Sequence, residues 1–121
     1  VRGDAGNDVL IGGDGSDTLL GGAGDDVIRG GLGADRLTGS EGADLFVIGA
    51  GESTAAARDI ITDFVSGVDR IDLSQLGNAS ATITAGAGMT TVAGTSASGS
   101  FAIAVQGFVA ASDLVLTEPS I

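Results

Sequence analysis

The chain has 121 residues and a formal net charge of −11, with 16 acidic residues against five arginines. It contains neither cysteine nor histidine, which excludes disulfides and the usual zinc ligands and leaves oxygen as the ligand for any metal. The negative charge disfavours a nucleic-acid partner, and no apolar run approaches the ~20 residues of a membrane span. We therefore expect the chain to be one domain, or part of one, and to be a soluble piece of a longer protein.

Five consecutive nonapeptides cover residues 3–47: GDAGNDVLI, GGDGSDTLL, GGAGDDVIR, GGLGADRLT and GSEGADLFV. Glycine always occupies positions one and four. Position six is always aspartate, and position eight is always a large apolar residue. The first six positions predict a tight turn with inward carbonyls, and the last three predict a very short strand with one core side chain. Such a fixed phase is not expected of a disordered linker.

Turn and strand alternate, so two repeats make one circuit and equivalent turns stack at about 4.8 Å. Stacking places Asp8, Asp26 and Asp44 in one column, and Asp17 and Asp35 in another. Carboxylates ~5 Å apart repel by roughly 3 kcal/mol at an effective dielectric of ~20. Three such pairs rival the whole stability of a small domain, roughly 5 to 15 kcal/mol. A hard dication between turns would remove this repulsion, and Ca²⁺ suits best because it accepts roughly six to eight oxygens in flexible geometry.

The pattern GGxGxDxUx resembles the RTX, or haemolysin-type, calcium-binding repeat. This resemblance implies an all-β, right-handed parallel β-roll. In that family each ion takes carbonyls from positions two and four of one turn, carbonyls from positions one and three of the turn two repeats later, and both aspartates. Carried over, three sites are implied: Asp4, Gly6 and Asp8 with Gly21, Ala23 and Asp26; Gly13, Gly15 and Asp17 with Gly30, Leu32 and Asp35; and Gly22, Gly24 and Asp26 with Gly39, Glu41 and Asp44.

The segment RDIITDFVSGVDRIDLSQLG, residues 58–77, follows the repeats. It resembles the segment after the roll in serralysin-type metalloproteases and in modules of bacterial alginate epimerases. The resemblance implies that Glu52, Asp59 and Asp63 complete calcium sites on the last two turns. The partners implied there are Gly31, Gly33 and Asp35 on one turn, and Ser40, Gly42 and Asp44 on the other.

Residues 65–69 (VSGVD) predict a turn between two short strands. The strands are expected to direct Ile60, Phe64, Ile71 and Leu73 inward. Of the remaining acidic residues, Asp69 and Asp72 are interpreted as structural and Asp25 as a solvated side chain at the variable fifth position.

The tail from Ser74 carries only two charges, Asp113 and Glu118. Residues 81–85 (ATITA) and 101–106 (FAIAVQ) alternate as strands do, and residues 114–116 predict a final strand. We expect Phe101, Ile103 and Val105 on one face, and a hairpin with a loose loop over residues 85–100. An antiparallel sheet or sandwich would then cap the open end of the roll. The predicted division is a roll at 1–47 and a β capping region at 48–121, continuous with it as one structural unit.

Other kinds of site that use glycine or acidic residues are excluded because the sequence lacks further residues that they require. No GKS or GKT sequence follows to make a phosphate loop, and no window fits an EF-hand. With no histidine or cysteine and the carboxylates committed to metal, no nucleophile and base pair is present, so we expect no catalytic residue.

The leading hypothesis is a secreted, non-catalytic module that folds on binding several structural Ca²⁺ ions outside the cell. Its parent would be a larger bacterial protein exported by the type I secretion apparatus, and SDLVL at residues 112–116 resembles the ending of type I signals. The alternative is a polysaccharide-binding accessory module, as in alginate epimerases, or an adhesin domain. Without tryptophan or tyrosine, a stacking platform for sugar rings is poorly supplied.

Overall fold

The computed structural model of the chain describes residues 2–49, 58–74, 80–86, 89–96, 99–107, 109–110 and 113–115. These residues form β-strands and include no α-helix, and within them no helix is long and apolar enough to cross a membrane. The strands are β1 (Val9–Ile11), β2 (Thr18–Leu20), β3 (Val27–Arg29), β4 (Arg36–Thr38), β5 (Leu45–Val47), β6 (Asp59–Ile61), β7 (Arg70–Asp72), β8 (Ser80–Ala85), β9 (Thr90–Ser96), β10 (Gly99–Val105) and β11 (Leu114–Val115).

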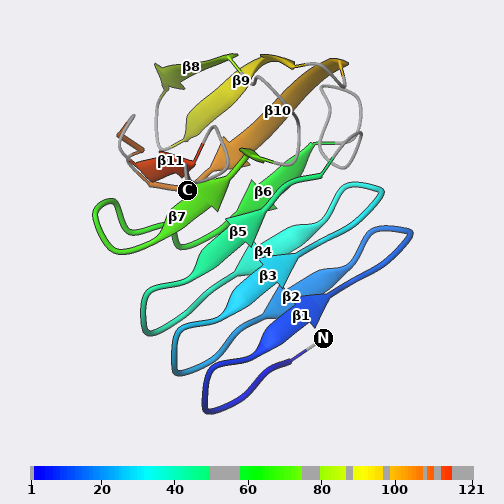
Figure 1. The fold of residues 1–121 in the computed structure, drawn as a ribbon, viewed down its shortest axis with the longest axis vertical. Helices are drawn as coiled ribbons and strands as arrows, with labels where there is room; N and C mark the ends of the chain where they lie inside the picture. Colours follow the sequence, from blue (N-terminus) through cyan, green and yellow to red (C-terminus); the bar gives the residue numbers. More distant parts are fainter. Residues whose placement is uncertain are drawn as a thin grey trace, which may run out of the picture.

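The strands alternate between two sheets, which confirms the predicted β-roll (Figure 1). The first sheet has the order β1-β3-β5-β7-β11, and the second has the order β2-β4-β6-β10-β9-β8. Pairing along the repeats is parallel and in register, with Val9 opposite Val27 and Thr18 opposite Arg36. Two nonapeptides therefore complete one circuit of the roll, as the repeat length requires.

The centre of each repeat strand supplies the core between the sheets. All five position-eight side chains are buried, as predicted: Leu10, Leu19, Ile28, Leu37 and Phe46. In these repeat strands the middle side chain points inward and its two neighbours point outward, because successive side chains point to opposite faces. Each repeat thus adds one apolar side chain to the core.

Both sheets continue past residue 47 through β6 and β7. β6 pairs with β4 so that Ile61 lies opposite Leu37, and β7 pairs with β5 so that Ile71 lies opposite Phe46. The expectation that Ile60 points inward is wrong: Ile61 is fully buried, whereas Ile60 is only partly buried. The register that places Asp59 beside Asp35 also places Ile61, not Ile60, over the core.

The other residues expected to point inward here are buried, namely Phe64, Ile71 and Leu73. The rings of Phe46 and Phe64 pack with their centroids 6.3 Å apart and tilted by 46°. The predicted turn at residues 65–69 is present, with the N–H groups of Val68 and Asp69 both donating to the carbonyl of Val65.

An antiparallel three-stranded arrangement, β8-β9-β10, lies at the end of the second sheet, where β10 pairs in parallel with β6. Phe101, Ile103 and Val105 are buried as predicted, and Ala102 and Ala104 are buried as well. Antiparallel pairing of β9 with β8 and with β10 confirms the hairpin expected within residues 85–100. Residues 90–96, expected to include a loose loop, form the regular strand β9. The last predicted strand is present as β11 beside β7, and Leu116 lies outside the described residues.

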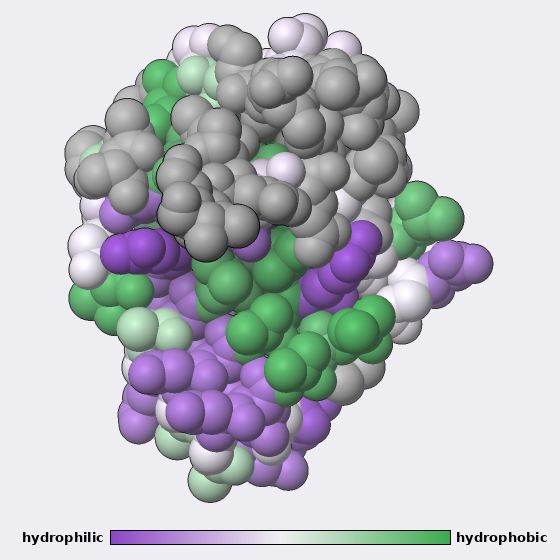
Figure 2. Space-filling view, in the orientation of Figure 1, coloured by the Kyte–Doolittle hydropathy of each residue, from purple (hydrophilic) through white to green (hydrophobic). Residues whose placement is uncertain are grey.

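The outer faces of the two sheets differ in character. On the first sheet, the outward side chains of the edge strand β1 are Val9 and Ile11, which are 70% and 63% exposed. On the second sheet, the corresponding residues are Thr18 and Leu20 on β2, and Arg36 and Thr38 on β4. Figure 2 shows hydrophobic surface gathered across the middle of the visible face, next to hydrophilic surface.

Candidate metal sites between the stacked turns

The position-six aspartates are joined from turn to turn by their own backbone. The N–H of Asp8 donates to Oδ1 of Asp26 over 2.8 Å, and the N–H of Asp26 donates to Oδ1 of Asp44 over 2.9 Å. In the other column the N–H of Asp17 donates to Oδ1 of Asp35 over 2.8 Å. These bonds hold the aspartates of equivalent turns one above another, in the two columns expected from the repeat.

Each column continues beyond the repeats. The N–H of Asp35 donates to Oδ1 of Asp59 over 2.9 Å, so Asp59, predicted as a ligand, extends the second column. The N–H of Asp44 donates to Oδ1 of Asp69 over 2.9 Å. The first column is therefore Asp8, Asp26, Asp44 and Asp69, and the second column is Asp17, Asp35 and Asp59.

Sequence reasoning missed Asp69 as a member of the first column. The signal was present: Asp-Arg-Ile at 69–71 matches Asp-Arg-Leu at 35–37, positions six to eight of the fourth repeat. The spacing hid it, because Asp69 follows Asp44 by 25 residues instead of 18.

In four members of the two columns, the second carboxylate oxygen is buried and has no hydrogen-bond partner in the protein. The atom is Oδ2, and the four aspartates are Asp8, Asp17, Asp26 and Asp44. Asp26 and Asp44 as whole residues are 1% and 2% exposed. A buried polar atom with no partner costs roughly 1 to 3 kcal/mol, and more if it is charged. These atoms therefore point to a positively charged partner from outside the protein.

The pKa of Asp44 also shows that its charged form is disfavoured in this position. Burial raises the pKa of Asp44 from an ordinary 3.8 to about 7, against the opposing hydrogen bond from the N–H of Asp26. Part of this rise in pKa comes from the nearby carboxylates of Asp69, Asp26 and Asp63. Burial also raises the pKa of Asp69. A cation within the column favours the charged carboxylates and so reverses this effect.

Backbone carbonyls enter the gaps between equivalent turns from both sides. A methyl group on Gly31 would lie 2.5 Å from the carbonyl oxygen of Gly13, two repeats earlier. From the other side, a methyl group on Gly12 would lie 2.7 Å from the carbonyl oxygen of Gly30. The oxygens placed in this way belong to Asp4, Gly6, Gly13, Gly15 and Gly24 from the earlier turns, and to Gly21, Gly30 and Gly39 from the later ones. Any side chain larger than hydrogen at these glycines would occupy the space next to the carbonyl oxygens.

The remaining predicted carbonyl donors belong to the same stacked turns: Gly22, Ala23, Gly31, Leu32, Gly33, Ser40, Glu41 and Gly42. Two repeats lack the second glycine, but their turns keep its conformation. Asp4 and Ser40 have φ angles of 67° and 66°, in the left-handed region that Gly13 and Gly22 occupy at 90° and 85°. The turn geometry is thus maintained throughout the array despite the substitution.

The two other predicted side-chain ligands are placed differently. Asp63 accepts hydrogen bonds at both oxygens, from the N–H of Gly39 over 2.9 Å and from the N–H of Ser40 over 2.6 Å. It thereby caps the start of the fifth turn. Glu52 lies outside the described residues.

A second side-chain ladder runs beside the first column. Oδ1 of Asn7 accepts the N–H of Asp25 over 2.8 Å, and Oδ1 of Asp25 accepts the N–H of Ala43 over 2.7 Å. The interpretation of Asp25 as merely a solvated side chain is therefore incomplete, since the exposed carboxylate also ties two turns together. Position five varies in the sequence, and among the described turns the ladder is found beside the first column, where Asn7 and Asp25 occupy this position.

The donor set decides which metal the turns suit. Within the part of the chain that the structure describes, no three acidic side chains are grouped so as to hold a metal ion. A cation between two turns would thus take carboxylates from successive aspartates and complete its shell with carbonyls. Such an all-oxygen, mostly neutral set with many donors fits Ca²⁺ better than Mg²⁺ or a transition metal.

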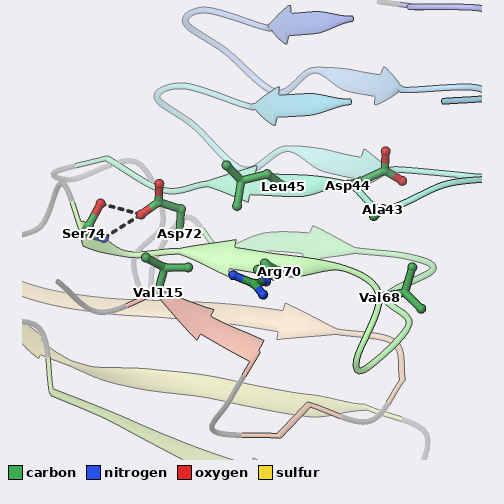
Figure 3. Close-up of a pocket in the computed structure, with 8 residues that line it drawn as sticks. All are labelled: Ala43, Asp44, Leu45, Val68, Arg70, Asp72, Ser74 and Val115. Carbon is green, nitrogen blue, oxygen red and sulfur yellow. Dashed lines mark hydrogen bonds between the residues drawn. The ribbon is translucent and has the colours of Figure 1, made fainter. Parts of the chain in front are cut away.

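An open pocket of about 410 Å³ lies on the outer side of the first sheet (Figure 3). Its lining is Ala43, Asp44, Leu45, Val68, Arg70, Asp72, Ser74 and Val115. Asp72 is held in place because its Oδ1 accepts both the N–H and the hydroxyl of Ser74, over 2.9 Å and 2.6 Å. The pocket therefore combines an aliphatic floor with one guanidinium and two carboxylates.

The solved structures that are similar to this chain include two modules of one enzyme. One is the AlgE6R3 subunit of the mannuronan C5-epimerase of Azotobacter vinelandii, with a TM-score of 0.57 and 29% identity over 93% of this chain and 80% of that one. The other is the AlgE6R2 subunit of the same enzyme, with a TM-score of 0.58 and 27% identity over 93% of this chain and 94% of that one. No curated protein matches the chain in sequence.

The family described as Peptidase M10 serralysin C terminal matches residues 2–106. This match spans the repeats, both aspartate columns and most of the capping strands. It also confirms the resemblance suggested by the nonapeptides and by the segment after them. The chain belongs to the serralysin C-terminal family of the M10 peptidases.

Proposed function

We propose that this chain is a calcium-binding β-roll module whose ions lie between equivalent turns of the two columns. The observation that carries the proposal is the set of buried Oδ2 atoms without hydrogen-bond partners in Asp8, Asp17, Asp26 and Asp44. The carbonyl oxygens directed into the same gaps supply the further ligands. When bound, Ca²⁺ neutralises the stacked carboxylates and crosslinks successive turns.

The side chains proposed to bind the ions are those of the two columns, Asp8, Asp17, Asp26, Asp35, Asp44 and Asp59. Glu52 and Asp63 remain predicted ligands of the last turns. The role of the metal is structural. Binding free energy becomes folding free energy because the carboxylates stacked within each column repel one another without it. Any catalytic activity would then belong to another domain of the parent protein, which the description of the family as a C-terminal part supports.

The expected calcium affinity suggests where the module folds. Extracellular calcium modules bind with dissociation constants of roughly 0.1 to 1 mM, far above the free calcium of a cytosol. The chain would stay unfolded in the cell, suited to export by a type I apparatus, and would fold on reaching calcium outside. The large negative charge favours an unfolded state in the absence of calcium, because it opposes collapse of the metal-free repeats.

Circular dichroism of the full chain tests the proposal. In excess chelator we expect a large loss of the β signal, which calcium in the millimolar range restores and the same concentration of magnesium does not. Asp26→Asn should raise the calcium midpoint, whereas Asp14→Asn, an equal change of charge on an exposed turn, should not. A chelated sample with the full β spectrum would contradict the coupling of metal to fold.

A second candidate function is polysaccharide binding, favoured by the similarity to two modules of a mannuronan C5-epimerase. The pocket on the first sheet offers Arg70 as a hydrogen-bond donor, whereas the hydroxyl of Ser74 already donates to Asp72. Asp44 and Asp72 oppose an anionic ligand. Titration calorimetry of the calcium-loaded chain with mannuronan oligomers would measure this binding. Loss on Arg70→Gln but not on Arg36→Gln, which lies on the other sheet, would locate it, and no heat at millimolar ligand would exclude it.

A further inference from the structure

The second sheet ends in a long edge strand. β8 pairs with β9 on one side and is the last strand of this sheet among the described residues. It has six residues, whereas the other strands at sheet ends, β1, β2 and β11, have three, three and two. In Figure 1 it lies at the end of the molecule opposite to β1. An edge strand of this length presents a row of backbone N–H and C=O groups that can pair with another strand.

The hydrogen-bond phase of the β8–β9 ladder determines which backbone groups of β8 face outward. The N–H of Gly86 donates to the carbonyl of Met89 over 2.7 Å, so these two residues form a hydrogen-bonded pair. Such pairs alternate along an antiparallel ladder, which makes Thr84 opposite Thr91 the next one. The residues between these pairs direct their N–H and C=O groups away from β9, and they are Ala81, Ile83 and Ala85.

The sequence of β8 reads the same in both directions around Ile83, because residues 81–85 are ATITA. In an antiparallel pair of two copies with a two-fold axis at Ile83, each Ile83 faces its counterpart. Thr82 of each copy then faces Thr84 of the other, and the outer alanines face each other. The hydrogen-bonded pairs in this arrangement fall on the residues whose backbone groups point outward. One register therefore matches both the side chains and the hydrogen bonds.

The side chains of β8 suit such a pairing on both faces of the sheet. Ile83 and Ala81 are partly buried against the hydrophobic core, and Ile83 of a second copy would cover surface that is still exposed. Thr82 and Thr84 are exposed on the other face, where cross-strand threonine pairs are favourable. The strand contains neither a charged residue nor proline, although these residues commonly protect an edge from pairing.

The distribution of charge also favours contact between two copies at this end. Residues 74–112 contain no charged residue, whereas all five arginines and every acidic residue except Asp113 and Glu118 precede residue 74. The roll thus carries most of the negative charge that keeps two copies apart. Because β8 lies at the end of the molecule opposite to β1, pairing through β8 would place the two charged rolls at opposite ends of a dimer.

We infer that β8 is a self-pairing interface. Two copies of the folded chain associate through antiparallel β8 strands centred on Ile83 and join their second sheets into one continuous sheet. The inference goes beyond calcium binding, because none of the residues that make the contact belongs to the aspartate columns. A single pair of strands is a small interface, so the association should be reversible and dependent on concentration.

Sedimentation velocity of the calcium-loaded chain at a series of concentrations tests the association. The weight-average mass should rise with concentration from that of one chain towards twice that value. A chain that stays monomeric up to about 1 mM would overturn the inference. The edge would then pair with a strand of different sequence, or with none.

Disulfide crosslinking tests the register, and the chain has no cysteine of its own to interfere. Thr82→Cys and Thr84→Cys proteins, mixed in calcium under mild oxidation, should crosslink at least about tenfold faster than either protein alone, because only the mixture places cysteines directly opposite one another. A mixture of Thr84→Cys with Thr95→Cys, an exposed position on the inner strand β9, is the control and should crosslink slowly. Equal rates in all mixtures would contradict the register.

Charge substitutions at the exposed threonines test the contact without disturbing the core. Thr82→Lys/Thr84→Lys should abolish the rise in mass because lysines of the two copies would face each other, and Thr82→Glu/Thr84→Glu should do the same. An equimolar mixture of the two variants should restore the dimer. Thr95→Lys is the control and should leave association unchanged. Circular dichroism in calcium verifies folding, and a folded double-lysine variant that associates like the native chain would show that β8 is not the interface.

Discussion

The backbone N–H of Asp8 donates a 2.8 Å hydrogen bond to Oδ1 of Asp26, eighteen residues along the chain. One carboxylate oxygen is thus committed to joining two turns, and the other is left buried without a partner. This division of labour explains why the position admits only aspartate in all five repeats. Asparagine would keep the bond and lose the charge, and glutamate would be too long to fold back over its own turn.

Replacing Asp26 by asparagine separates these two roles. The amide oxygen can still accept the N–H of Asp8, whereas the negative charge in the gap is lost. Because calcium affinity follows the number of charged ligands, we expect the calcium midpoint to rise roughly tenfold or more. Isothermal titration of the variant would measure the shift. Asp14→Asn is the matched control, and an equal shift in both would mean that net charge alone determines the affinity.

Replacing Gly21 by alanine tests the close approach of the aspartate to its own turn. The added methyl group would lie 2.6 Å from Oδ2 of Asp26 and 2.8 Å from the carbonyl oxygen of Gly39. Both contacts are too short, so the turn must shift, and we expect a loss of roughly 2 to 4 kcal/mol in the free energy of unfolding with calcium present.

Gly6→Ala provides the comparison for Gly21→Ala. Its methyl group would meet nothing within 4 Å, and only the φ of +96° is unfavourable. We expect a loss of roughly 1 to 2 kcal/mol. Urea denaturation in saturating calcium would rank the two variants, and a smaller loss for Gly21→Ala would contradict the crowding of the carboxylate.

Replacing Leu37 by alanine tests how much the one core side chain of a repeat contributes to stability. Its side chain is fully buried, and truncation to alanine should cost roughly 2 to 5 kcal/mol. Leu32 lies five residues earlier at the tip of the turn and is 51% exposed, so Leu32→Ala should change stability by no more than about 0.5 kcal/mol. Chemical denaturation of both in calcium gives the comparison, and similar losses would place the core elsewhere.

The pH dependence of stability should show the contribution of Asp113. Burial opposes its charge, but three hydrogen bonds outweigh that effect and hold the pKa below the ordinary value of 3.8. They come from Ser66, Ala110 and Gly67. A carboxylate whose pKa is lowered in the folded state contributes stability that is complete above the unfolded pKa and is lost as the pH falls through the folded one.

We therefore expect the difference in unfolding free energy between the native chain and Asp113→Asn to be constant from about pH 5 to 8 and to shrink below about pH 4. Calcium binding weakens in both proteins as the pH falls, so the difference between them is the quantity to follow. Urea midpoints at several pH values would provide it. A difference that persists unchanged to pH 3 would show that the lost contacts, and not the ionised carboxylate, matter.

The nine-residue period allowed the architecture and the two columns to be predicted, because each position has a distinct physical requirement. The predictions were less accurate after residue 47, where the nine-residue period ends. Asp59 and Asp69 follow their column neighbours by 24 and 25 residues, and the choice between Ile60 and Ile61 depends on that altered register. Strand β9 is rich in threonine, alanine and glycine, so its alternation is weak, and pairing with β8 and β10 determines its structure.

The parallel register of the strands also constrains how such an array can change in length. Val9 lies opposite Val27, and Thr18 lies opposite Arg36. Loss of two adjacent repeats, such as residues 12–29, would remove one complete circuit and leave every surviving side chain on its own sheet. Loss of a single repeat would transfer all preceding strands to the opposite sheet. Loss of residues 12–20, for example, would place Val9 and Ile11 where Thr18 and Leu20 now lie. The height of the module is therefore free to vary only in whole circuits if every outward side chain is to stay on its own sheet.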